Sequence, residues 1–229
     1  MSKTKSSGKA LPILSIVFFS VGIVLFAVKV VESIVFRMLN QRSDWLHIIV
    51  AECGKTAAFV FPAVFFIICA AMFLRRSEKS RRMLAVSFVM QLLSAVVLLG
   101  RLLYVQNIYG FANMNVTTGG ALACLLLIAV LSLLSAIFEA KGKRKKVLII
   151  LIAICGFVFA LFMSLTLILP VLQQPAYFGE HIALLLYRVV SGLLYAAALI
   201  FYYIALLFTA FYKERLPRKV QTVKLVMKK

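Results

Sequence analysis

Six long runs of apolar residues dominate this sequence of 229 residues and leave little choice of fold. A helix crosses the hydrocarbon core of a bilayer, about 30 Å thick, with about 20 apolar residues. The runs are continuous rather than alternating, which favours helices over the strands of a membrane barrel. They span residues 11–36, 46–74, 83–104, 118–138, 147–172 and 182–212. We therefore predict an all-α polytopic membrane protein, a bundle of six transmembrane helices.

The composition supports a membrane class, because 64% of the residues are hydrophobic and only 14% are charged. A soluble domain of this size would expose enough apolar surface to associate. We expect a basic tail over residues 1–10, a transmembrane domain over 11–212 and a second basic tail over 213–229. The first run exceeds the apolar region of about 7–15 residues found in a cleavable signal peptide, so it is expected to stay as a helix.

The basic residues follow a regular pattern along the chain. Twenty of the 26 lysines and arginines lie in the two tails and in the connections around residues 75–82 and 141–146. Short basic loops stay in the cytoplasm, which predicts that both termini are cytoplasmic. We expect these basic inner loops to contact anionic lipid headgroups. The compact loops favour a bacterial plasma membrane; an internal membrane of a eukaryote is the alternative.

The net charge of +19 does not indicate a nucleic-acid partner, because no aromatic residues are interleaved with the basic clusters. Four cysteines and two histidines show no spacing typical of a metal or redox site, so neither a metal nor another cofactor is expected. Phosphate-binding, metalloprotease and nucleophile-elbow motifs are absent from the sequence, and no catalytic residue is predicted. The chain is therefore not expected to be an enzyme.

A few charged residues lie within the spans, at the ends that the topology places outside. Lys29 and Glu32 are three residues apart in the first run, and Glu52 and Lys55 are three apart in the second. This spacing puts each pair on one helix face. Because a short loop joins these two helices, the pairs are expected at similar depth, facing one another.

Two further spans add charged groups at the same ends. Arg101 belongs to the third span, while Glu180, His181 and Arg188 lie at the start of the sixth. Ionisable groups at membrane depth usually face a partner or a water-filled cavity. Together with Lys29, Glu32, Glu52 and Lys55, they predict an outward-facing polar pocket. Its excess of cations would suit an anionic or zwitterionic small solute.

An alternative role for these charges is structural: cations that extend toward the interface and pair with carboxylates only to hold the helices together. Two polar residues at mid-depth, Gln91 and Thr166, are expected to hydrogen-bond across helices. Pro62 and Pro170 are expected to kink their helices or, for Pro170, to end one.

Three functions fit the sequence. The first is a small-solute transporter, or the solute-binding membrane subunit of a transporter that works with a partner subunit. The second is a non-catalytic scaffold, sensor or immunity-type protein acting through its basic inner loops. The third is an enzyme that modifies lipid headgroups, which would need Glu52. We favour the first, because it uses the charged residues within the spans.

Overall fold

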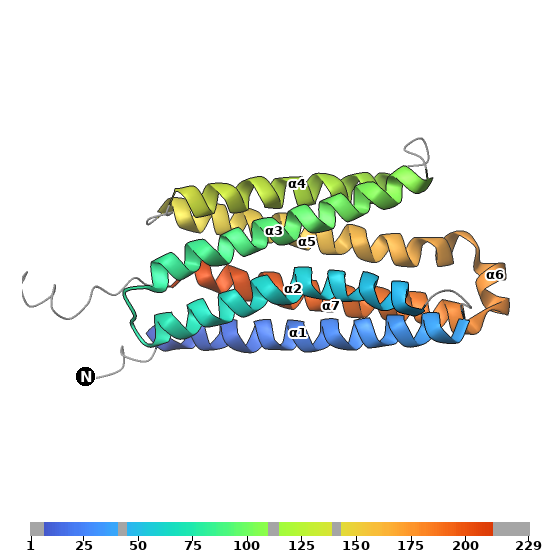
Figure 1. Cartoon of the computed structure of the whole chain (residues 1–229), viewed down its shortest axis with the longest axis horizontal. Helices are drawn as coiled ribbons and strands as arrows, with labels where there is room; N and C mark the ends of the chain where they lie inside the picture. Colours follow the sequence, from blue (N-terminus) through green and yellow to red (C-terminus); the bar gives the residue numbers. More distant parts are fainter. Residues whose placement is uncertain (1–6, 41–44, 110–114, 139–142, 213–229) are drawn as a thin grey trace, which may run out of the picture.

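The computed structural model describes residues 7–40, 45–109, 115–138 and 143–212, and every regular element in these ranges is an α-helix (Figure 1). The helices are α1 (Ser7–Asn40), α2 (Trp45–Leu74), α3 (Ser80–Tyr109), α4 (Val116–Ile137), α5 (Lys143–Gln173), α6 (Pro175–Glu180) and α7 (Ile182–Ala210). All except α6 are long and apolar enough to cross a membrane. The fold is therefore all-α, and its six long helices support an integral membrane location.

Several helix ends differ from those predicted. α3 and α5 begin in the basic connections, at Ser80 and Lys143, since lysine and arginine favour helix and the helices extend past the apolar run. Pro170 lies inside α5, so it does not end that span as one prediction had it. The sequence also failed to predict α6, a single short helix that begins with Pro175 in its first turn.

The six long helices form a closed ring. Each packs against its neighbour in the sequence, and α7 packs against both α5 and α1, which closes the circle. α1 begins and α7 ends at one end of the bundle, which we call the terminal end; α6 lies at the opposite, distal end (Figure 1). The side of the membrane that each end faces stays a prediction, and most residues of the two predicted tails lie outside the described ranges.

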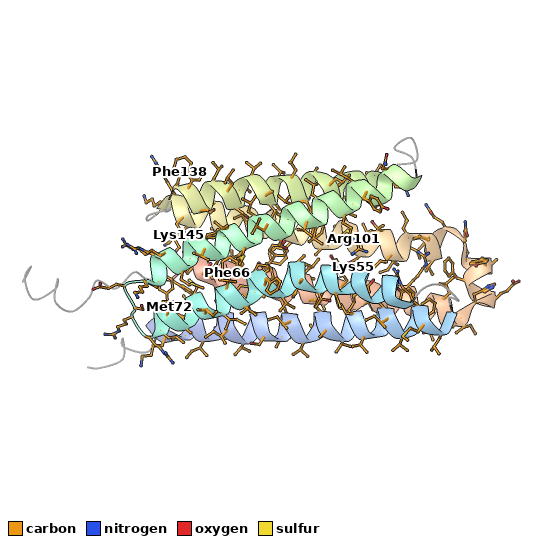
Figure 2. All side chains as sticks on the ribbon, in the orientation of Figure 1. Lys55, Phe66, Met72, Arg101, Phe138 and Lys145 are labelled. Carbon is orange, nitrogen blue, oxygen red and sulfur yellow. The ribbon has the colours of Figure 1, made fainter. Side chains whose placement is uncertain are left out.

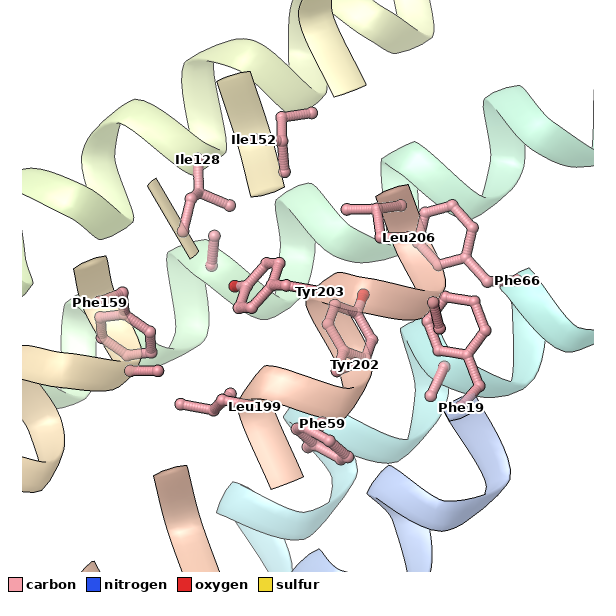
Figure 3. Packing of buried hydrophobic residues seen from close by; sticks show 14 of the residues in the cluster. Phe19, Phe59, Phe66, Ile128, Ile152, Phe159, Leu199, Tyr202, Tyr203 and Leu206 are labelled. Atoms are coloured by element: carbon pink, nitrogen blue, oxygen red, sulfur yellow. The ribbon is translucent and has the colours of Figure 1, made fainter. Parts of the chain in front are cut away.

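Large aromatic side chains fill the ring on its terminal side (Figure 3). Phe19 stacks on Phe66 with ring centroids 5.5 Å apart, and Phe66 meets the edge of Phe88 at the same distance. Tyr202 of α7 lies between Phe59 and Phe66. These rings are almost fully buried. Aromatic contacts of this kind add to the energy of area burial, so this part of the core is expected to be rigid.

Small residues let α7 approach its two neighbours. A side chain at Gly156 of α5 would meet the ring of Tyr203, and one at Gly22 of α1 would come within 3.2 Å of the carbonyl oxygen of Ala198. The hydroxyl of Ser15 donates a hydrogen bond of 3.0 Å to the carbonyl oxygen of Ala205. Close packing of this kind holds membrane helices together where lipid competes for apolar contacts. It fixes α7 inside the ring, where it carries part of the candidate site.

Candidate functional site

Glu52 of α2 is the centre of a cluster of charges in the distal half of the bundle. Its side chain is completely buried. Lys55, one turn further along α2, donates a hydrogen bond to its carboxylate. Lys29 and Arg37 of α1 place nitrogen atoms 3.8 Å from its two oxygens. The two helices therefore face one another through these charges, as the short connection between them suggested.

Arg101 of α3 brings a fourth cation to the cluster. Figure 2 shows Arg101 and Lys55 on facing helices in the distal half of the bundle, and Arg101 lies close enough to Glu52 to interact with it electrostatically. Lys29 is buried, with only 8% of its side chain exposed, and its ammonium lies 5.8 Å from the ring centre of Tyr195 in α7. Four helices thus surround the cluster.

The cluster lies deep in the bundle. At 1.5 Å per residue, Lys29, Lys55 and Arg101 lie about 7–10 Å from the midpoints of their helices, and Glu52 about 11 Å. A hydrocarbon core extends about 15 Å on each side of its centre. If the long helices are centred in the bilayer, all four charged groups lie within the depth of the hydrocarbon.

Positive charge exceeds negative charge in this cluster. Glu32 of α1 is the second carboxylate nearby: it interacts with Lys29 and accepts a hydrogen bond from Ser191 of α7. One oxygen of Glu32 and one of Glu52 are buried without a hydrogen-bond partner. Four cations therefore face two carboxylates that they satisfy only in part. Burying unbalanced charge is costly, so the arrangement favours an anion that joins the cations.

The remaining predicted site residues do not join this cluster. Glu180 and His181 are exposed at the end of α6, where the imidazole stacks on the ring of Tyr177. Arg188 of α7 places its guanidinium 5.6 Å from the ring centre of Phe178, and its buried Nε has no hydrogen-bond partner. The eight predicted residues thus separate into a cluster made by Lys29, Glu32, Glu52, Lys55 and Arg101, and a group on α6 and α7 made by Glu180, His181 and Arg188.

A cavity of about 30 Å³ lies beside the cluster, in the centre of the ring. Lys55 belongs to both the cluster and the cavity, because its side chain lines the cavity together with Gln91 and Ser94 of α3.

The expectation that Gln91 and Thr166 form hydrogen bonds across helices is wrong. Gln91 has no hydrogen-bond partner on either amide atom, and the Thr166 hydroxyl donates to the carbonyl oxygen of Phe162 in its own helix.

Sequence reasoning left out three residues that the structure brings to the site. Arg37 has a signal in the sequence, because it follows Lys29 by eight residues and therefore lies on the same helix face. Tyr195 and Ser94 resemble ordinary packing residues of a membrane helix and carry no such signal. Arg42 and Asp44, which lie in the α1–α2 connection, fall outside the described residues.

The donor set suits an oxyanion better than a metal. Among the described residues, no group of three or more histidine, cysteine or acidic side chains converges as a metal site would require. Lysine and arginine are donors only, and the forked guanidinium matches the oxygens of a carboxylate or a phosphate. The side chains of the cluster therefore have the hydrogen-bonding chemistry that suits a carboxylate or a phosphate group.

Comparisons with protein-family models, curated protein sequences and solved structures found no match to this chain.

Proposed function

We propose that this chain is a membrane protein that binds a small anionic or zwitterionic solute, either as a transporter or as the solute-binding subunit of one. One observation carries the proposal: four cations from three helices converge around the buried carboxylate of Glu52, namely Lys29, Arg37, Lys55 and Arg101. Such a concentration of charge at hydrocarbon depth is rare and usually marks a substrate pathway. The proposed function involves no catalytic step.

A purely structural ion-pair network is a weaker account of the same cluster. Such a network would stabilise the bundle best with matched charges and short hydrogen bonds. Here two of the three ion pairs of Glu52 have nitrogen–oxygen distances of 3.8 Å, longer than a hydrogen bond. An added carboxylate or phosphate would balance the charge and accept hydrogen bonds from the cations.

The proposal places the distal end outside the cell and the terminal end in the cytoplasm of a bacterium. Its support is the charge of the connections: the α2–α3 turn at the terminal end carries Arg75 and Arg76, both exposed. Exposed basic residues at this end suit the cytoplasmic face and its anionic lipids. A partner subunit would then dock on the cytoplasmic side, while the solute enters from outside.

Native mass spectrometry of the protein, extracted gently from its own membrane, tests this function. We expect a small anionic adduct on the wild-type protein, identified after release by liquid chromatography and mass spectrometry. Arg101→Gln and Lys29→Gln should lose the adduct, because each removes a cation from the cluster. A stoichiometric protein partner in the same spectra would favour the subunit form of the proposal.

The matched control is Lys143→Gln, which removes an exposed cation at the start of α5, at the terminal end. This variant should keep the adduct. An anion bound equally by all three variants, or a wild-type protein carrying only lipid, would contradict solute binding at the cluster. Circular dichroism of each variant shows whether a lost adduct reflects lost folding instead.

A further inference from the structure

The central cavity presents polar groups that the protein itself does not satisfy. Gln91, only 3% exposed, has no hydrogen-bond partner for either its amide nitrogen or its amide oxygen, and the buried hydroxyl of Tyr202 has none either. Both residues line the cavity. A buried amide without partners costs about 1–3 kcal/mol, so such groups in native proteins usually face a water molecule or a ligand.

The cavity is small and central. A water molecule needs about 10–15 Å³ of such space, so a cavity of about 30 Å³ has room for two waters or for one group the size of a carboxamide. At 1.5 Å per residue, Ser94 and Tyr195 on its wall lie within about 2 Å of the midpoints of α3 and α7. The cavity therefore reaches the middle of the membrane-spanning part.

The cavity meets the charge cluster on its distal side and aromatic rings on its terminal side. Lys55 lines the cavity directly. Tyr195 also lines it, and the ammonium group of Lys29 lies near the ring of Tyr195. Beyond Tyr202, toward the terminal end, Phe66 and Phe19 are fully buried and stacked. Access is therefore expected from the distal end, past the cations, and not from the terminal end.

We propose that the cavity is the inner end of an anion-selective vestibule, and that it holds the uncharged, hydrogen-bonding end of the solute. The anionic group lies among Lys29, Lys55 and Arg101, and a group that both donates and accepts hydrogen bonds, such as a primary amide or a hydroxyl, fills the cavity against Gln91 and Tyr202. This inference rests on the proposed function and narrows its substrate class: a small organic anion with a polar, uncharged end.

Cysteine accessibility in intact membranes tests the vestibule. In a protein whose Cys53, Cys69, Cys124 and Cys155 are replaced by alanine, Ser94→Cys places a thiol on the cavity wall. The probes are two methanethiosulfonates of similar size, one carrying a sulfonate and the other a trimethylammonium group. We expect the anionic reagent to modify the thiol about 10-fold faster or more, because a cleft of one charge concentrates its counterion. Lys55→Gln should reduce that ratio.

The control is Val97→Cys. Val97 lies one turn from Ser94 on the same helix and is 55% exposed on the outer surface of the bundle. It should react with neither charged reagent at this depth. An unreactive Ser94→Cys, or equal rates for both reagents, overturns the vestibule. The proposed function could still hold without a vestibule. In that case the wild-type protein would carry an anion in native mass spectrometry, and Arg101→Gln would lose it.

A pair of isosteric anions tests the hydrogen-bonding end. Succinamate carries a primary amide where 4-methylpentanoate carries an isopropyl group with the same number of non-hydrogen atoms. At millimolar concentration, succinamate should slow modification of Ser94→Cys at least about 3-fold more than 4-methylpentanoate does, and adding Gln91→Leu should remove this difference. Equal protection by the two anions, or no protection by either, overturns the assignment of the cavity to a polar group.

Discussion

The two halves of the bundle fill the interior of one helical ring in different ways. The terminal half is packed with aromatic rings from α1, α2, α3 and α7, with Phe66 at their centre. The distal half holds Glu52 and four cations, and a cavity in the centre of the ring separates them from the aromatic core. Close packing stabilises a fold, whereas buried, partly satisfied charges cost stability. The comparison indicates that the terminal half holds the bundle together, and it places the residues of the proposed function in the distal half.

The largest effect is expected in the terminal half, from Phe66→Ala. Phe66 is fully buried between Phe19, Phe88 and Tyr202, so its loss leaves a cavity that rigid neighbours cannot fill. The free energy of unfolding should fall by about 3–5 kcal/mol. Denaturation of the protein in mixed micelles measures it.

The matched control is Phe61→Ala on the same helix, whose side chain is 59% exposed on the outer surface. This variant should lower the free energy of unfolding far less than Phe66→Ala does, since lipid or detergent replaces the lost contacts. Similar losses for the two variants would remove the distinction between a rigid terminal core and its surroundings.

The next effect concerns Glu52→Gln in the distal half. Lys29, Arg37 and Lys55 would lose their shared carboxylate while staying buried or partly buried, and breaking such a pair costs about 3 kcal/mol or more. The same denaturation measurement should show this loss, and a second change, Lys55→Gln, should restore part of it. Glu78→Gln, which alters an exposed carboxylate, serves as the control and should change stability little.

A third change tests how tightly α7 is held in the ring. Gly156→Ala adds a methyl group that would lie 2.3 Å from ring atoms of Tyr203, so either the ring or the helix must move. Overpacking of this kind should lower the free energy of unfolding by about 1–3 kcal/mol. Gly100→Ala, where the added methyl meets nothing within 4 Å, should be neutral or slightly stabilising. Equal changes in stability for the two variants would mean that the close approach of α5 and α7 is not needed for the stability of the bundle.

The smallest expected effect has the opposite sign. Gln91→Leu removes a buried amide without partners and replaces it with an apolar group of similar size, so stability should rise by about 1 kcal/mol. Adduct binding, measured by native mass spectrometry, should fall in the same variant. A loss of stability would show that the amide of Gln91 is satisfied in the unliganded protein, and would weaken the comparison between the two halves.

Much of the fold could be predicted because the signal is local. A bilayer requires about 20 apolar residues per helix, so run length alone predicts the six spans. Helix ends are less predictable, since Lys143 and its basic neighbours favour helix although they are polar. α6 is too short to produce an apolar period, and a proline in its first turn is typical of many turns.

The site could be predicted only in part. The three-residue spacing of Glu52 and Lys55 predicts that they share one helix face, where they form an ion pair. Lys29 and Glu32 have the same spacing, but the ion pair of Lys29 is with Glu52. The contacts between helices could not be predicted, because they depend on how far each helix is rotated and shifted in the ring. These contacts bring Lys29 to Glu52 and add Arg101 to the cluster.

The sequence by itself determined the number of spans, the alternation of basic and neutral connections, and the local pairing of Glu52 with Lys55. Only the tertiary structure decided that α7 closes the ring between α5 and α1, and that Gln91 faces an open space instead of a partner. The physical reason is the range of the forces. Hydropathy and helical spacing act over a few residues of one helix, whereas a cavity exists only where side chains of several helices fail to meet.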